Sequence, residues 1–221
     1  MKTPILVALV LLCRPLMAVD AFAAVRVANT YTPPFASGIW FVVQGGDTPN
    51  VNHHFQVPEQ WYGIDIVRTE QRALTTGDGS RLGDCFSYGQ QVVSPCTGTV
   101  LAVENARPDN QIGATDAEHE YGNHVIIDAG KNEYVVLAHF KPGSITVAPH
   151  DRLVAGQPIG LVGNSGNTTM PHLHMHIQNA PALRHGDGRL FSFTGVIGTI
   201  AGTRLENAAV PLLAGMWLQR P

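Results

Sequence analysis

Short runs of apolar and β-branched residues recur along the chain, and Gly, Pro, Asn and Asp separate them. Within the runs, apolar positions either alternate with polar ones or are continuous, as in half-buried and fully buried strands. No long amphipathic helix stands out. The pattern predicts an all-β, antiparallel fold. The expected strands are 40–44, 63–67, 98–104, 124–128, 134–140, 160–163 and 173–178.

Two polar, glycine-containing stretches without periodicity, 68–84 and 105–120, are expected to be surface loops. Loops of this length commonly border a binding groove. At 221 residues the chain suits one sizeable domain with extensions. We expect a leader over 1–23, an N-terminal segment over 24–50, one main domain over 51–180, and a tail over 181–221 that packs back on it.

The first residues have the layout of a secretory signal peptide. Lys2 precedes an apolar run from Ile5 to Leu12, and small residues follow at Ala21 and Ala23. A membrane span needs about 20 apolar residues, and charged residues interrupt this stretch, which favours a cleaved leader over a retained anchor. The sequence therefore predicts export, to the periplasm or outside the cell.

Charge and cysteine content narrow the function further. Charged residues make up 14% of the chain and the formal net charge is -3, so there is no basic surface of the kind that binds nucleic acid. After the leader, only Cys85 and Cys96 remain. An even pair in an exported chain predicts a disulfide; metal ligation by the two thiols is the competing interpretation.

The densest chemical feature is the run from His172 to His176. In a strand, side chains alternate between faces, so His172, His174 and His176 point the same way. Neutral imidazole is a common zinc ligand, but a catalytic zinc needs three protein ligands and an open position. Further ligands must come from elsewhere; Asp65 and His139, lone polar residues in apolar strands, are the candidates.

Several motifs in order along 63–178 resemble peptidase family M23, the lysostaphin-like zinc metallopeptidases. The matching segments are Gly163 to His174, Tyr121 to Ile127, Leu137 to His139, Ser94-Pro95 with Gly98 and Val100, and Gly156-Gln157 with Ile159-Gly160. The resemblance implies an antiparallel β-sheet groove with zinc at its floor. It also implies metal ligation by Asp65 and His174, with His139 and His172 around the attacking water and the developing oxyanion. His176 matches no residue with a role and is expected to support the ligand strand or lie at the surface.

One position departs from the family. Its first histidine ligand stands four residues before the aspartate, where this chain has Trp61. Either His54, with His53 as the second choice, folds back beside Asp65, or the site is inactive. The resemblance thus implies an exported zinc metalloendopeptidase that hydrolyses peptidoglycan cross-bridges, stem peptides or another glycine-rich peptide. The alternative is a metal-free module that binds cell wall or activates a partner hydrolase.

Overall fold

The computed structural model describes residues 24–206 and 209–221, so the expected leader lies outside the described residues. The regular secondary structure of this part of the chain is almost entirely β, as predicted. Its only helices are short 3₁₀ turns: η1 (His53–Gln56), η2 (Pro58–Gln60) and η3 (Leu82–Asp84). None of these is long and apolar enough to cross a membrane.

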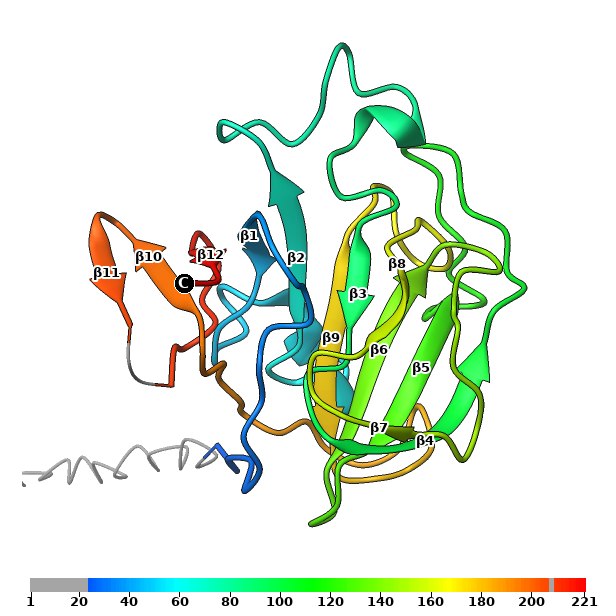
Figure 1. Cartoon of the computed structure of the whole chain (residues 1–221), viewed down its shortest axis with the longest axis vertical. Coiled ribbons are helices and arrows are strands. Elements are labelled where there is room, and N and C mark those ends of the chain that lie inside the picture. The colour runs from blue at the N-terminus through cyan, green and yellow to red at the C-terminus, as the bar shows by residue number, and fades with distance from the viewer. Residues whose placement is uncertain (1–23, 207–208) are drawn as a thin grey trace, which may run out of the picture.

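A ten-stranded sheet dominates the structure, with the order β11-β10-β12-β1-β2-β9-β6-β5-β4-β7 (Figure 1). Neighbouring strands in it are antiparallel throughout. Its strands are β1 (Ile39–Gln44), β2 (Ile64–Thr69), β4 (Gly98–Glu104), β5 (Asn123–Asp128), β6 (Tyr134–Phe140), β7 (Arg152–Leu153), β9 (Leu173–Gln178), β10 (Ile197–Ile200), β11 (Thr203–Leu205) and β12 (Trp217–Gln219). A separate pair, β3 (Gln91–Val93) and β8 (Pro158–Leu161), forms a small second sheet.

The two faces of the large sheet differ in chemistry because side chains alternate along each strand. On β2, Ile64 and Ile66 belong to the main hydrophobic core, which also contains Val92 of β3 and Ile159 of β8. Asp65 lies between the two isoleucines, so its side chain belongs to the other face. The same alternation on β9 places its apolar residues Leu173, Met175 and Ile177 in the core. It leaves His174 and His176 on the face of Asp65.

Every strand expected from the sequence is present, with ends that differ by at most a few residues. The tail does more than pack on the sheet: β12 pairs with β1 and β10 pairs with β12, which extends the sheet at the β1 side. The strands missed by the sequence pattern are β3, β7, β10, β11 and β12. Each has four residues or fewer, too short for a clear period of two.

The predicted disulfide is wrong in this structure, where Cys85 and Cys96 are both free and buried. The two thiols have different surroundings. Cys96 belongs to the main core and lies near Glu133, whereas Cys85 follows η3 and lies near Asp84. Burial raises the pKa of the Cys96 thiol to about 12, which keeps it protonated.

Candidate active site

Strand register brings the first two candidate residues together. Asp65 of β2 is the direct cross-strand partner of His174 of β9, and directly opposed side chains share a face. As a result, Nδ1 of His174 lies 3.0 Å from Oδ1 of Asp65. Both side chains are buried.

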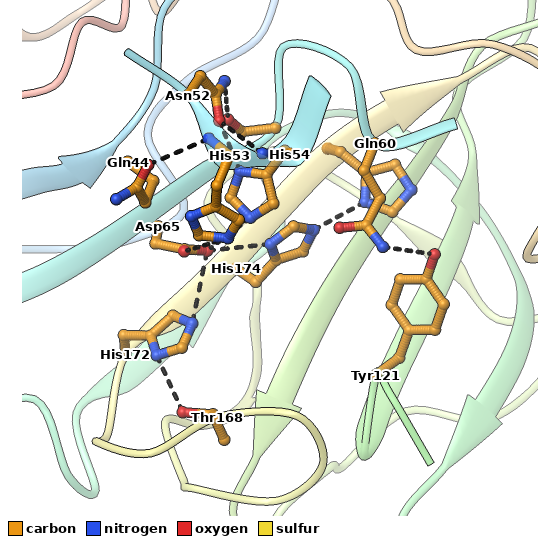
Figure 2. Close-up of polar contacts among 12 residues, drawn as sticks. Gln44, Asn52, His53, His54, Gln60, Asp65, Tyr121, Thr168, His172 and His174 are labelled. Atoms are coloured by element: carbon orange, nitrogen blue, oxygen red, sulfur yellow. Dashed lines mark hydrogen bonds and ion pairs between the residues drawn. The ribbon is translucent and has the colours of Figure 1, made fainter. Parts of the chain in front are cut away.

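The 3₁₀ turn η1 places two further imidazoles beside Asp65 (Figure 2). Nε2 of His54 lies 3.4 Å from Asp65 Oδ1, and the His54 side chain is 5% exposed. Nε2 of His53 lies 4.0 Å from Asp65 Oδ2, and the His53 side chain is 57% exposed. Ligand atoms of His53, His54 and Asp65 all lie within 4.8 Å of one another.

A buried amide next to η1 distinguishes His54 from His53. The Asn52 side chain donates its two N–H groups to the carbonyls of Gly46 and Gly63, at 3.1 and 3.0 Å. Its Oδ1 therefore accepts, and it lies 2.9 Å from Nδ1 of His54. A neutral imidazole carries one ring proton, so this bond leaves a lone pair on Nε2, the atom that faces Asp65. His54 is thus presented as a ligand.

Trp61, at the position where the resemblance implies a histidine ligand, contributes to holding η1. Its indole Nε1 donates to the carbonyl of Phe55 at 3.0 Å. The rings of Phe55 and Trp61 are stacked, with centroids 6.0 Å apart and an interplanar angle of 14°. The tryptophan therefore supports the turn that carries His53 and His54.

A β-bulge directs His139 into the groove. In the β5–β6 pairing, Asn123 pairs with Phe140 and His124 with Ala138, so His139 is the extra residue. Its φ of 67° lies in the left-handed region, rare for a residue other than glycine. Bulges re-aim side chains near active sites. Here Nδ1 of His139 donates to the Ser165 carbonyl at 2.8 Å, and the ring lies 4.7 Å from that of His172 between centroids.

His172 lies just before β9 and also faces Asp65. Its Nδ1 donates to the carbonyl of Met170 at 2.9 Å and lies 3.1 Å from Oγ1 of Thr168. Its Nε2 lies 3.4 Å from Asp65 Oδ1 (Figure 2). His139 and His172 therefore both hold Nδ1 on a backbone carbonyl and keep Nε2 for other partners.

The electrostatics favour an ionised carboxylate among mostly neutral imidazoles. Burial by itself would raise the pKa of Asp65, but the imidazoles of His172 and His54 outweigh it, and that pKa lies well below its usual value. Burial lowers the pKa of His174 to about 3. Burial, followed by repulsion from His172, holds the pKa of His139 well below its usual value. The pKa of His172 is raised, because attraction to Asp65 outweighs the effect of burial.

This donor set fits a zinc ion. Ligand atoms at the corners of a tetrahedron with bonds of about 2.1 Å lie roughly 3.4 Å apart. Asp65 Oδ1 lies 3.4 Å from His54 Nε2 and 3.0 Å from His174 Nδ1, close to that spacing. Two histidines and one carboxylate are a common catalytic zinc set.

The candidate ligands His54, Asp65 and His174 line a cavity of about 560 Å³. Its lining includes His139 and His172, apolar side chains such as Leu74 and Met170, and polar ones such as Glu120. Leu74 and Glu120 belong to the two stretches expected from the sequence to border a groove.

Residues 85–186 match the family model for peptidase family M23. Over this segment, 102 of its 221 residues, the chain is similar to peptidase family M23. The matched M23 segment contains His139, His172, His174 and His176 and begins after His54 and Asp65. No curated protein matches the chain.

Three solved structures illustrate what this chain is similar to. A zinc-containing peptidase from Vibrio cholerae is 18% identical, with 72% of this chain covered and a TM-score of 0.44; the match spans 39% of that protein. The catalytic domain of a mutant of the prophage-encoded M23 protein EnpA from Enterococcus faecalis is 22% identical, with 71% of this chain and 92% of that chain covered and a TM-score of 0.44. The catalytic domain of the antimicrobial peptidase lysostaphin from Staphylococcus simulans is 18% identical, with 72% and 85% covered and a TM-score of 0.37.

The sequence pattern did not predict the roles of two residues next to the candidate ligands. His176, expected in support of the ligand strand or at the surface, is fully buried, and its Nδ1 lies 2.9 Å from Nε2 of His174. No role was predicted for Asn52. Asparagine before a short helical turn is a common cap, and Asn52 does cap η1. Its contact with the His54 ring depends on the path of the turn, which the local sequence does not specify.

Proposed function

We propose that this chain is a zinc metalloendopeptidase that cleaves peptide bonds by activating water. The observation that supports this most strongly is the surroundings of Asp65 Oδ1 at the cavity. Ring nitrogens of His54, His172 and His174 lie within 3.4 Å of it, and they come from a turn, a loop and a strand. Bringing four such groups together at one point serves no evident structural purpose.

In this proposal His54, Asp65 and His174 hold the metal. When bound, zinc lowers the pKa of a coordinated water to about 7 and polarises a carbonyl group. His139 accepts the proton of the attacking water at Nε2, since its Nδ1–H is committed to the Ser165 carbonyl. His172 acts as the imidazolium, the form favoured by its raised pKa beside Asp65, and so carries a proton on both ring nitrogens. Its Nδ1–H is held by the Met170 carbonyl and its Nε2–H donates to the developing oxyanion.

The proposed substrate is peptide from the cross-bridges or stem peptides of peptidoglycan, or another glycine-rich peptide. The similarity of residues 85–186 to peptidase family M23 supports this class. The signal-peptide-like leader supports it too, because export would place the enzyme in the periplasm or outside the cell, where peptidoglycan lies.

The test begins with the metal content of the purified chain. We expect about one zinc per chain, release of new amino termini from peptidoglycan, loss of activity with a chelator, and recovery when zinc is returned. His54→Ala should lose both zinc and activity. His53→Ala is the matched control, adjacent in the same turn, and should keep its zinc. Stoichiometric zinc in His54→Ala, or its loss only in His53→Ala, would contradict the ligand assignment.

The second candidate, a metal-free module that binds cell wall or activates a partner hydrolase, is favoured by one observation. Trp61 replaces a residue type that the family uses as a ligand. This candidate predicts that the purified chain lacks zinc, does not cleave peptidoglycan, and still sediments with it. Zinc binding together with hydrolysis rules it out.

A further inference from the structure

A buried row of side chains runs along β9, directly behind His174. It consists of His174, His176 and Gln178, every second residue of the strand, and all three are buried. Nε2 of His174 lies 2.9 Å from Nδ1 of His176, and Nε2 of His176 lies 3.0 Å from Oε1 of Gln178. Because a ring nitrogen can be donor or acceptor, these distances alone do not show which atom of each pair donates the hydrogen bond.

Gln178, at the end of the row away from His174, determines which atoms donate. Its amide Nε2 donates to the carbonyls of Ala180 and Ala182, at 2.6 and 2.8 Å. Carbonyl oxygens accept only, so the amide nitrogen must stay on that side and Oε1 must face His176. Turning the amide over would place its oxygen against both carbonyls and leave buried acceptors without donors, which is costly.

With Gln178 fixed, one arrangement pairs a donor with an acceptor at every contact along β9. Oε1 of Gln178 accepts, so His176 carries its proton on Nε2. Burial favours the neutral imidazole with a single ring proton, so Nδ1 of His176 is an acceptor. His174 therefore carries its proton on Nε2 and turns the lone pair of Nδ1 toward Asp65 Oδ1 at 3.0 Å. The competing tautomer would donate Nδ1–H to Asp65 and break the pairing with His176; a cation held by both atoms would favour the first arrangement.

We propose that Gln178, acting through His176, fixes the tautomer of His174 so that Nδ1 is ready to bind the metal before the metal arrives. Gln178 and His176 are positioning residues, since neither touches the cavity. The proposal builds on the proposed function, because the metal is the zinc of that site. It parallels the fixing of His54 by Asn52, in which an amide anchored on two carbonyls again leaves the ring nitrogen facing Asp65 unprotonated.

The first experiment uses metal-free wild-type protein, so it does not depend on activity. Nitrogen-15 NMR of the imidazole rings distinguishes protonated from unprotonated ring nitrogens. We expect the His174 and His176 signals of neutral rings protonated at Nε2. A His174 ring protonated at Nδ1 would overturn the proposal, whatever the protein does with zinc.

The second experiment interrupts the row and restores it. Gln178→Met keeps the length of the side chain but removes the acceptor, so His174 should populate both tautomers. Zinc affinity, measured by competition with a chelating dye, should fall roughly 10–100-fold, as for other groups that orient metal ligands. In the double variant Gln178→Met with His176→Glu, a carboxylate again accepts the His174 Nε2–H, so affinity and tautomer should recover. Gln219→Met, with an exposed glutamine at the end of β12, is the matched control.

These outcomes separate this proposal from the enzymatic one. A folded Gln178→Met variant with wild-type zinc affinity, or a double variant that does not recover, overturns the positioning role. If wild-type protein has the expected tautomers but binds no zinc, the tautomer assignment is supported and the zinc peptidase proposal fails. Because the wild-type spectrum needs no variant, loss of folding in Gln178→Met leaves the proposal testable.

Discussion

At the scale of single residues, His139 lies where a regular strand would point it into the core. The bulge and left-handed φ turn it to the groove instead. If its role is to accept a proton, His139→Ala should lower kcat by about 10²–10⁴-fold, the usual contribution of general acid–base catalysis. Zinc content should stay near one per chain, because His54, Asp65 and His174 are unchanged. Metal analysis and hydrolysis rates on the same preparation check this.

His172 provides a second variant with the same expected separation between chemistry and metal binding. His172→Ala removes the group assigned to the oxyanion, so turnover should fall strongly while zinc is retained. His119→Ala, which removes a partly exposed histidine paired with Asp116 outside the site, is the control and should match wild type. Loss of zinc in both His139→Ala and His172→Ala would show that the division of roles is wrong.

Residue types and motif order were enough to predict that Asp65, His139, His172 and His174 meet. Neighbouring strands then bring them together, since Asp65 and His174 are cross-strand partners. The sequence could not explain the preference for His54 over His53. That preference depends on burial and on the Asn52 side chain, and both follow from the path of a turn. The roles of His176 and Gln178 depend on hydrogen-bond direction, which has no counterpart in a sequence pattern.

At the scale of elements, η1 is a one-turn segment that carries a proposed zinc ligand, and so short a turn has little stability of its own. The Phe55–Trp61 stack and the indole hydrogen bond tie it to the residue that follows η2. An aromatic pair contributes about 0.5–1.5 kcal/mol and a hydrogen bond about as much. Trp61→Ala should therefore make η1 more mobile and weaken zinc binding by roughly tenfold or more. Trp61→Phe keeps the stack and should fall between wild type and Trp61→Ala.

The measurement is zinc affinity by competition, together with near-ultraviolet circular dichroism to confirm that the sheet is intact. Wild-type affinity in a folded Trp61→Ala variant would show that η1 holds His54 without the tryptophan. The same element illustrates a limit of sequence reasoning. From the sequence, Trp61 indicates the loss of a ligand, whereas its contacts with Phe55 support the turn that carries the proposed replacement, His54.

Strand prediction succeeded where apolar runs were long and failed in the tail for a related reason. Strands β6 and β9 have clear apolar positions and were predicted with their observed ends. Strands β10, β11 and β12 are short and contain Gly, Thr, Arg and Gln, so their local pattern is weak. Strands β10 and β11 form a local hairpin that joins the sheet only through β12, and β12 pairs with β1, which lies near the other end of the described chain. The residues of a short sequence segment do not indicate pairing with a strand so far away in the chain.

At the scale of the whole molecule, the candidate ligands lie on β2 and β9, near the middle of a sheet that the tail extends through β12 and β1. Phe193, Met216 and Leu218 of the tail share one core with Ile64 and Leu173 beneath the site. We therefore propose that the tail is an integral part of the folding unit, and that the site depends on it for stability.

Two leucines in the tail test that dependence. Leu218 is fully buried on β12, whereas Leu213 is 36% exposed. Leu218→Ala leaves a cavity in the shared core and should lower the free energy of unfolding by about 2–5 kcal/mol, while Leu213→Ala should have a much smaller effect. The tail and the site strands share that core. In Leu218→Ala, fluorescence of Trp217 on β12 and zinc release from the site should therefore report one common transition, at lower denaturant concentration than in the wild type. Two separated transitions, with zinc retained after the tail has unfolded, would show that 181–221 is an independent appendage.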